Sequence, residues 1–514
     1  MPGVLSWLDA PANGRGIRFA QPDGSWELWP YERLAALAFR YAYGLRAAGV
    51  RRGDGVALVG HSGPDFVAAL FGALRAGAVA TPIAPPMRFR DAAGYADQLR
   101  TILATARPVL LLARTQDAFA PDLGTPVVRY GELPEGPAHP MAPGEIALCQ
   151  FTSGTTGRVR GVRVPYRALA ANLDAIRRWL AMTPADPTAS WLPVHHDMGL
   201  IGCLLAPVTT GTDLWLMPPE EFVRRPARYL ACFGRDGARL TAMPGFGLEH
   251  IARRVRDEDL AGMDFSAWRA VIVGAERLVP EALYRFHARC APYGLARRAL
   301  APAYGLAEAT LAVTGSPLDE EPAVHDGVVG CGRPLSGVDI AVLDEYGRPT
   351  GGVGEITVGG ASVPAGTIRT GDAGFLRDGQ LYVLGRYGDS LKVRGTTVFA
   401  EDLDALVATQ TGVSTGRIAC LLGVDAGTDT AVLVTERVPG EARQRAGTLL
   451  RSRLPGARVD VADLPVGAVP RTSSGKPKRR ALWQAYLAGE LPLGGDQRGR
   501  VLAEHHAGER GGCA

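Results

Sequence analysis

Apolar and polar positions follow two alternating patterns along the first part of the chain. Residues 31–49 and 65–77 carry apolar side chains every three or four positions, which predicts amphipathic helices. The apolar runs at 55–60, 78–85 and 146–151 are short and continuous, which predicts buried strands. Alternating helices and strands are typical of an α/β fold with mostly parallel sheets, and the alternation returns between residues 166 and 315.

The pattern changes towards the C-terminal end. Residues 324–385 form short, glycine-rich, strand-like segments, whereas 401–410 predict a helix and 417–424 and 430–436 predict strands. We therefore expect a large N-terminal domain over 1–387, a small α+β domain over 388–490 and a flexible tail over 491–514.

The most apolar stretch does not predict a membrane span. Residues 200–219 are interrupted by Asp213 and by prolines and glycines, so we expect them to form buried core. The Pro/Gly-rich segment 134–144 predicts a surface connection. The first residues lack the charged start and the apolar run of a secretory signal.

Composition narrows the class of protein. A chain of 514 residues is too long for one hydrophobic core, and 46% hydrophobic with 21% charged residues is ordinary for a globular enzyme. The net charge of +4, without a basic stripe interleaved with aromatics, does not favour a nucleic-acid partner. Seven scattered cysteines without a CxxC pair predict reduced thiols in a cytoplasmic protein, rather than disulfides or a zinc site.

The segment 151–162, FTSGTTGRVRGV, carries the strongest chemical signal. It follows a predicted strand and precedes a helix that begins near Tyr166, which is where α/β proteins place anion sites. Its glycines allow close backbone approach, and its hydroxyls and N–H groups can cradle phosphate oxygens. By itself the segment could also be a flexible surface loop. It is not a Walker A motif, because the chain's single Gly-Lys pair, Gly475-Lys476, is followed by Pro477.

Further motifs follow this segment in a fixed order, and together they resemble the acyl-adenylate-forming (ANL) superfamily, in its fatty-acyl-AMP ligase and acyl-CoA synthetase branch. The resemblance extends from about residue 30 to 485. The motifs are WLPVHHDMGL (191–200), VGAE (273–276), AYGLAEAT (303–310), GE (354–355), RTGD (369–372), GRYGDSLKVRG (385–395) and PRTSSGKPKR (470–479).

The resemblance implies a fold and an activity. The expected fold is a large domain of two αβ-layered sheets with a distorted β-barrel over 324–385, and a small mobile α+β domain. The expected enzyme is a ligase that uses ATP and Mg²⁺ to convert a carboxylic acid, fatty or from a natural-product pathway, to acyl-AMP with release of pyrophosphate. The acyl group would pass to CoA or to the phosphopantetheine of a carrier protein.

The resemblance also assigns roles in nucleotide binding. Asp372 should accept hydrogen bonds from the ribose hydroxyls, because an ionised carboxylate is a pure acceptor. Arg386 should reach the ribose or a phosphate, and Glu308 should help to bind Mg²⁺. The β- and γ-phosphates should be held by Thr152, Ser153, Gly154, Thr155, Thr156 and Gly157, and the adenine by Gly274, Ala275, Glu276, Tyr304 and Gly305.

Catalysis and substrate binding are assigned in the same way. Lys476 should be the main catalytic cation, since a compact ammonium can bridge the acyl carboxylate and the α-phosphate. His196 should lie beside the acyl carboxylate, and Gly388 occupies the hinge position, where glycine tolerates backbone rotation. The acyl pocket should be walled by Trp191, Met243, Pro244, Gly245 and Phe246.

The sequence departs from the family pattern in two places. Val159 and Arg160 stand where the family usually has Pro-Lys, and the segment 359–372 is shortened. An insertion that is associated with refusal of CoA is missing or truncated. The acceptor therefore stays open between CoA, a carrier-protein pantetheine and a separate thioesterifying protein.

Alternative interpretations receive less support. GVSTG (412–416) matches the serine-hydrolase elbow formally, but a predicted helix precedes it and a strand follows, the reverse of the required order. Neighbouring His195, His196 and Asp197 do not converge on a metal as the HExxH histidines do, and His505–His506 lie in the solvated tail. A non-catalytic nucleotide-binding homologue, or an adenylate former without thioesterification, remains as the second hypothesis.

Overall fold

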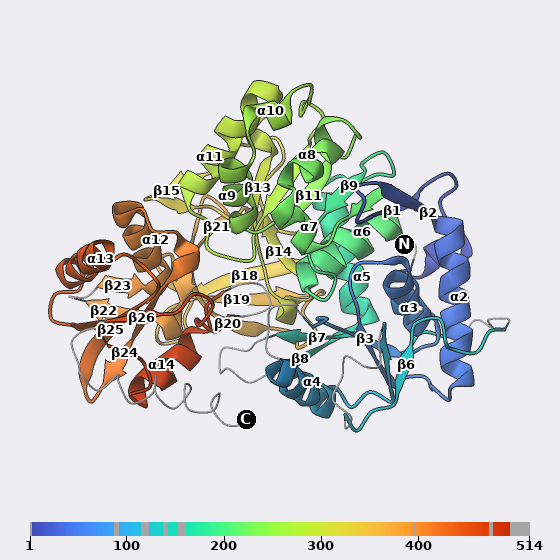
Figure 1. Cartoon of the computed structure of the whole chain (residues 1–514), viewed down its shortest axis with the longest axis horizontal. Coiled ribbons are helices and arrows are strands. Elements are labelled where there is room, and N and C mark those ends of the chain that lie inside the picture. The colour runs from blue at the N-terminus through green and yellow to red at the C-terminus, as the bar shows by residue number, and fades with distance from the viewer. Residues whose placement is uncertain are drawn as a thin grey trace, which may run out of the picture. The chain divides into compact units, whose positions relative to one another are not determined.

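The chain folds into two compact units (Figure 1). A computed structural model describes residues 3–86, 92–114, 123–136, 142–152, 160–393, 396–471 and 476–493. Unit 1 contains the described residues up to 152 together with 160–370 and 374–383, and unit 2 contains 371–373 and the described residues from 384 onward. The predicted α/β fold with a smaller C-terminal part is confirmed; the boundary expected at residues 387–388 stays a prediction.

Nine described strands of unit 1 form one sheet. Neighbouring strands pair in parallel from β1 to β13, and antiparallel strands close both edges. In spatial order the strands are β17 (Arg333–Pro334), β14 (Ala312–Gly315), β13 (Leu300–Gly305), β12 (Ala270–Val273), β11 (Leu240–Met243), β9 (Thr188–Ser190), β10 (Leu214–Leu216), β1 (Gly16–Ala20) and β2 (Trp26–Pro30).

A second sheet of unit 1 has six strands, and its buried members confirm the apolar runs predicted as strands. The order is β6 (Val127–Arg129), β5 (Leu110–Ala113), β3 (Gly55–Val59), β4 (Val79–Ile83), β7 (Ile146–Thr152) and β8 (Arg160–Pro165). Helices α2 (Tyr31–Ala47) and α3 (Pro64–Arg75) confirm the predicted helices and pack closely, since a Cβ at Gly72 would lie 2.6 Å from the Tyr41 Cβ.

The glycine-rich region forms two smaller sheets, most of whose residues belong to unit 1, while 371–373 of β20 and 384–386 of β21 belong to unit 2. One is the four-stranded sheet β18 (Val338–Leu343), β19 (Gly354–Gly360), β20 (Ile368–Arg377) and β21 (Gln380–Arg386). The other is the hairpin β15 (Val324–His325) and β16 (Val328–Val329). These strands occupy the region expected to form a distorted barrel.

Helices cover the sheets of unit 1, and α9 packs between α8 and α11 beside the nine-stranded sheet (Figure 1). Stretch 200–219, expected to be core, forms the buried π-helical segment η2 and the elements that follow it. The remaining helices are α1 (Ser6–Asp9), α4 (Ala92–Ala106), α5 (Tyr166–Trp179), η2 (Met198–Leu205), α6 (Ala206–Thr210), α7 (Pro219–Arg224), α8 (Pro226–Gly234), α9 (Gly245–Arg254), α10 (Asp257–Leu260), α11 (Pro280–Cys290), η3 (Ala291–Tyr293), η4 (Arg297–Ala299) and η5 (Ala307–Ala309).

Unit 2 is an α+β unit with its own apolar core. Its sheets are the hairpin β22 (Ser390–Val393) and β23 (Thr396–Phe399), and the three-stranded β24 (Ile418–Asp425), β25 (Thr428–Glu436) and β26 (Arg458–Leu464). Its helices are η6 (Tyr387–Asp389), α12 (Ala400–Thr411), η7 (Thr415–Arg417), α13 (Gly440–Arg453) and α14 (Arg479–Leu487).

The cysteines within the described ranges are buried and unpaired. They are Cys149, Cys203, Cys232, Cys290, Cys331 and Cys420. Burial raises the pKa of Cys203 to about 11 and that of Cys290 and Cys331 to about 12, which keeps these thiols protonated. Among the described helices, none has the length and apolar character needed to cross a bilayer.

Candidate active site

The predicted acyl-pocket residues come together at the carboxyl ends of two neighbouring parallel strands, β9 and β11. Trp191 follows β9 directly, and Pro244 links β11 to helix α9. Phe246, in the first turn of α9, approaches Trp191 edge-on with ring centroids 6.5 Å apart. The Phe246 side chain is 50% exposed, so this wall has one open end.

The wall continues into residues that the motifs did not identify. Trp191 stacks on the buried Phe222 of α7, with ring centroids 4.1 Å apart and planes within 1°. Phe246 also contacts the His250 ring one turn later in α9, at 5.5 Å. Four aromatic rings from three elements thus form one surface, which we call the aromatic wall: Trp191, Phe222, Phe246 and His250.

Close packing explains a glycine in this wall. A Cβ at Gly247 would lie 2.9 Å from Cζ2 of Trp191 and 3.1 Å from Sδ of Met243. Any larger residue would press on an indole ring that is itself stacked and buried. Gly247 therefore gives the predicted wall residues room to meet.

The loop predicted to line the adenine, residues 274–276, follows the next parallel strand, β12. Gly274 needs to be glycine because a Cβ there would lie 2.9 Å from the Ala303 carbonyl oxygen. Ala275 adopts a left-handed backbone with φ of 68°. The Glu276 carboxylate accepts a hydrogen bond of 2.8 Å from the backbone N–H of Phe246, where the start of α9 favours negative charge. Glu276 thereby joins the predicted adenine loop to the aromatic wall.

Tyr304 and Gly305 end strand β13, the neighbour of β12. A Cβ at Gly305 would lie 2.1 Å from the Leu311 carbonyl oxygen, so the backbone there requires glycine. The turn that follows, η5, presents the half-buried Glu308 between the buried Ala307 and Ala309. The hydroxyl of Thr310, whose φ is 73°, closes the turn by donating to the Ser362 carbonyl at 2.6 Å.

The histidines of the 191–200 motif lie in the turn before η2. Asp197 caps this helix by accepting from the Met198 N–H at 2.7 Å. The rings of His195 and His196 have centroids 4.9 Å apart. Burial lowers the pKa of His195 well below its ordinary value, and His196 and His61 lower it further, so His195 is neutral near pH 7.

Unit 2 holds a second group of predicted residues. Arg386 pairs with Asp372 at 2.9 Å between Nε and Oδ1, and Asp372 is only 8% exposed. The Arg386 side chain is 39% exposed, so the pair joins a buried carboxylate to a guanidinium that reaches solvent. Lys476 is exposed, just before α14.

The predicted hinge residue, Gly388, lies in the short helix η6. Its φ is outside the left-handed region, and a Cβ there would meet nothing within 4 Å. The observed conformation at 388 is thus open to other residues, and the hinge role stays a prediction.

The phosphate-loop prediction falls largely outside the described residues. Thr152 ends strand β7. The other predicted members, Ser153, Gly154, Thr155, Thr156 and Gly157, lie outside the described ranges, as do His505 and His506. Each unit therefore contains its own share of the predicted site, and the individual roles stay predictions.

Residues 8–366 match the sequence profile of AMP-binding enzymes, over more than half of the chain. This chain belongs to the AMP-binding enzyme family. The resemblance inferred from the ordered motifs, and the expectation of an adenylate-forming ligase, are thereby confirmed.

Similar proteins span most of this AMP-binding enzyme. It is 30% identical to the 4-hydroxyphenylalkanoate adenylyltransferase of Mycobacterium marinum, over 90% of this chain and 87% of the relative. It is 29% identical to the medium-chain fatty acid–acyl-carrier-protein ligase JamA of Moorena producens, over 86% and 87% of the two chains. A solved structure from a study of fatty acyl-adenylate ligases from E. coli and L. pneumophila covers 95% of this chain and 98% of its own, with 29% identity and a TM-score of 0.86.

The serine-hydrolase alternative for this AMP-binding enzyme lacks its structural context. Ser414 lies between helix α12 and strand β24, and its side chain accepts a hydrogen bond from the Gly416 N–H at 3.4 Å. A nucleophile elbow requires a strand before the serine and a helix after it. Ser414 instead caps the short helix η7.

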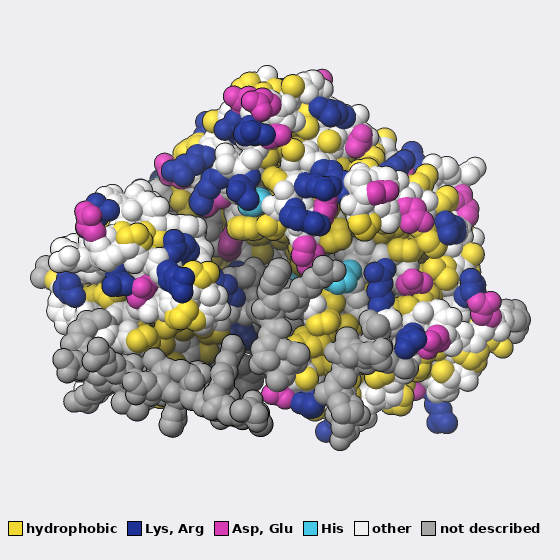
Figure 2. All heavy atoms as spheres, viewed as in Figure 1, with side chains coloured by type: hydrophobic (Ala, Val, Ile, Leu, Met, Phe, Trp, Pro, Cys, Tyr) yellow, Lys and Arg dark blue, Asp and Glu magenta, His cyan; other side chains and the backbone are white. Residues whose placement is uncertain are grey.

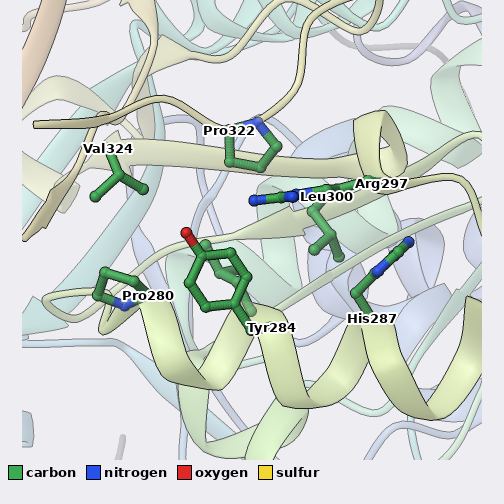
Figure 3. Close-up of a pocket in the computed structure, with 8 residues that line it drawn as sticks. Pro280, Tyr284, His287, Arg297, Leu300, Pro322 and Val324 are labelled. Atoms are coloured by element: carbon green, nitrogen blue, oxygen red, sulfur yellow. The ribbon is translucent and has the colours of Figure 1, made fainter.

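A small pocket of unit 1 contains none of the predicted site residues (Figure 3). Tyr284 and His287 of α11 line it together with Arg297, whose guanidinium lies 5.0 Å from the centre of the Tyr284 ring. The pocket is too small for a nucleotide or an acyl chain.

Proposed function

We propose that this AMP-binding enzyme activates a carboxylic acid and transfers it to a phosphopantetheine thiol. In the first step, a carboxylate oxygen attacks the α-phosphorus of ATP, the bond to the β-phosphate breaks, and pyrophosphate leaves. In the second step, the thiol sulfur attacks the acyl carbon, its proton passes to a base or to water, and AMP leaves.

The observation that carries the proposal is the hydrogen bond between Glu276 and the backbone N–H of Phe246. Glu276 belongs to the loop that follows β12, and Phe246 belongs to the aromatic wall. A single contact thus couples the loop expected to line the adenine to the wall expected to hold the acid. A site that joins an acid to a nucleotide needs these two surfaces to be fixed together.

In the first step a carboxylate must approach the α-phosphate of ATP, and both are negatively charged. The site therefore needs a positive charge to reduce their repulsion and hydrogen-bonding groups to orient them. Lys476 supplies the positive charge between the carboxylate and the α-phosphate. His196 beside the carboxylate can orient it by hydrogen bonding. Asp372, which pairs with Arg386, accepts hydrogen bonds from the ribose hydroxyls.

The residues available fit magnesium bound mainly through the nucleotide. Among the described residues, no group of three or more His, Cys, Asp or Glu side chains could hold a metal without help. Mg²⁺ is commonly held by one or two carboxylates together with substrate phosphates, and Glu308 is the carboxylate in place. Bound there, the ion would neutralise charge on the phosphates.

The aromatic wall favours an acid with an extended apolar body. Phe246 is 50% exposed and offers an apolar face that an acyl or aryl chain can contact, while the buried Trp191 and Phe222 support it from behind. The named relatives act on a hydroxyphenylalkanoate and on a medium-chain fatty acid. We therefore infer a fatty or aryl-alkanoic substrate.

The acceptor inferred here carries a phosphate. Arg253 and Arg254 of α9 and Arg285 of α11 are exposed. Basic side chains also gather over the upper part of the face drawn in Figure 2. Such a surface attracts anionic partners. CoA and a pantetheinylated carrier protein share that chemistry, and the unpaired cysteines suit the reducing cytoplasm, where both occur.

The first experiment measures pyrophosphate release with ATP, Mg²⁺ and a panel of straight-chain and aryl-alkanoic acids. We expect turnover with at least one acid, and a loss of about 100-fold or more in Lys476→Ala, because one transition-state charge is removed. Lys478→Ala, two residues away, is the matched control and should keep the wild-type rate.

The second experiment identifies the acceptor by mass spectrometry of the products. Separate reactions contain CoA, a pantetheinylated carrier protein or no thiol. A thioester in one of the first two assigns the acceptor, whereas acyl-AMP alone in all three means that a separate protein completes the transfer. ATP binding without pyrophosphate release with any acid would refute the proposed activity and favour the non-catalytic homologue.

A further inference from the structure

The chain on the two sides of residues 472–475 lies side by side in unit 2. Arg471 and Pro477 form an antiparallel bridge, and the Lys478 N–H donates to the Pro470 carbonyl at 2.7 Å. Lys476 therefore lies beside the point where these two chain segments are hydrogen-bonded to each other. We call residues 470–471 the first leg and residues 476–479 the second leg. The position of Lys476 depends on the contacts that fix these two legs to the rest of unit 2.

The second leg is fixed by Arg479, the first residue of α14. Its Nη1 lies 3.0 Å from Glu401 and its Nη2 lies 2.5 Å from Asp404, both on helix α12. Its Nε donates to the Cys420 carbonyl of strand β24 at 3.1 Å. One guanidinium thus ties the start of α14 to a helix and to a strand, using three of its nitrogens.

The partners of Arg479 are themselves held in place. Asp404 accepts a second hydrogen bond, from the Cys420 backbone N–H at 2.6 Å. Burial raises the pKa of the Asp404 carboxyl, and the positive charge of Arg479 opposes that rise. The Arg479 side chain is only 13% exposed, so solvent screens this cluster little.

The first leg has a separate anchor, Arg471. Its Nη2 donates to the Gly416 carbonyl at 2.7 Å and lies 3.9 Å from the carboxylate of Glu436. The other oxygen of Glu436 accepts the backbone N–H groups of Gly467 at 3.0 Å and Val469 at 2.9 Å. The two legs are therefore fixed to different parts of unit 2 by two arginines.

We propose that Arg479 is a positioning residue that sets the place of Lys476 for adenylate formation; this inference rests on the proposed function. Arg479 lies three residues from Lys476 and makes the contacts that fix the start of α14. A planar guanidinium with several donors can hold these three acceptors at once, which a lysine ammonium on a flexible stem cannot do in the same geometry. Arg479 itself touches no reacting atom.

A double-mutant cycle tests whether Arg479 acts through Lys476. The proteins are wild type, Arg479→Lys, Lys476→Ala and the double variant. The measurements are acyl-AMP formation in a single turnover and thioester formation from supplied acyl-AMP. We expect Arg479→Lys to lower kcat for adenylation about 10- to 100-fold, because a small misplacement of a catalytic group is costly, while transfer from supplied acyl-AMP stays near wild type. In the Lys476→Ala background, Arg479→Lys should cause no further loss.

Three results would overturn this role: an additive loss in the double variant, equal losses in both steps, or no loss in Arg479→Lys. Absence of adenylation in the wild type with every acid would instead contradict the proposed function. Arg445→Lys is the matched control, since Arg445 forms an exposed pair with Glu441 on α13 and should leave both steps unchanged. Should Arg479→Lys fail to fold, Glu401→Ala removes one of the three acceptors of Arg479 and leaves Asp404 in place. A smaller selective loss in adenylation is then expected, and its absence counts against the proposal.

Discussion

Individual side chains in unit 1 show how local sterics shape the candidate site. Gly247, Gly274 and Gly305 each lie where a Cβ would meet a neighbour at 2.9 Å or less. At Gly274 and Gly305 the neighbour is a backbone carbonyl, so the requirement is one of fold. At Gly247 the nearest neighbour is the Trp191 ring, so the requirement concerns the aromatic wall.

Gly247→Ala should therefore weaken binding of the acid and leave binding of ATP unchanged. The added methyl group would press on Trp191, which Phe222 prevents from moving back. We expect the KM for the acid to rise about 10-fold, the usual effect of one misfitting methyl group, with the KM for ATP unchanged. Steady-state kinetics with each substrate varied in turn provide the measurement. Gly351→Ala, where a Cβ meets nothing within 4 Å, is the control, and equal changes in both KM values would contradict the prediction.

Replacing each of two buried amide side chains in unit 1 should change the free energy of unfolding in opposite directions. Gln150, on β7, is 3% exposed, and its amide has no hydrogen-bond partner among the residues that the structure describes. Asn172, on α5, donates to the Ala312 carbonyl at 2.8 Å and accepts from the Ala312 N–H at 3.1 Å.

Gln150→Leu should raise the free energy of unfolding by about 1 kcal/mol, since it removes an unpaired polar group from the interior. Asn172→Leu should lower it by about 2 kcal/mol, because both backbone groups of Ala312 lose their partner. Urea denaturation of the two variants and the wild type measures the differences. A loss of stability in Gln150→Leu comparable to that in Asn172→Leu would mean that the Gln150 amide is bonded.

At the scale of elements, four neighbouring parallel strands gather the candidate site of unit 1. The residues that follow β9, β11 and β12, and those that end β13, come from segments up to 114 residues apart and meet at the carboxyl edge of one sheet. This is where open α/β sheets generally bind ligands. The turn between β9 and η2 adds the paired histidines to this edge.

The partly exposed His195 in that turn should give unit 1 a pH-dependent stability. The pKa of His195 lies well below its ordinary value of 6.5 in the folded chain, mainly because of burial. Below pH 6.5 the unfolded chain takes up a proton that the folded chain does not, so the free energy of unfolding should fall as the pH drops from 7 to 5. In His195→Gln this fall should be smaller. Chemical denaturation across this pH range measures the two slopes, and equal slopes would show that His195 does not contribute.

Much of this arrangement could be predicted from the sequence, because elements follow from local periodicity. The apolar runs at 55–60 and 78–85 became β3 and β4, and the segment 31–49 became α2. The ordered motifs also predicted where along the chain an acyl wall and an adenine loop should lie. Contacts between distant segments left no comparable signal: Phe222 stacks on Trp191 across 31 positions, and Arg479 meets Asp404 across 75. Those pairings depend on how the elements pack, which periodicity does not encode.

At the scale of the whole molecule, the predicted residues are divided between two units. Unit 1 contains the aromatic wall, the loop 274–276 and Glu308, and unit 2 contains Asp372, Arg386 and Lys476. An enzyme divided in this way can run two reactions with one nucleotide site if its small unit changes position between them. Gly388 is the position at which the family resemblance places that change.

Two substitutions at Gly388 should distinguish an effect on stability from an effect on the movement of the small unit. Gly388→Ala should leave stability within about 0.5 kcal/mol of wild type, because the site is open and its φ suits any residue. Gly388→Pro fixes φ and should slow thioester formation about 10-fold more than adenylation. Single-turnover assays of each step measure the ratio. Equal effects on the two steps would place the hinge elsewhere.

The buried cysteines allow the opening rate of each unit to be measured. Five of the six cysteines named above lie in unit 1, and Cys420 alone of these lies in the core of unit 2. An alkylating reagent can reach a thiol of this kind only when the surrounding structure opens. The rate at which Cys420 gains mass, compared with the rates at the other five, therefore reports how often the small unit opens independently of the large one, without any label having to be engineered into the chain.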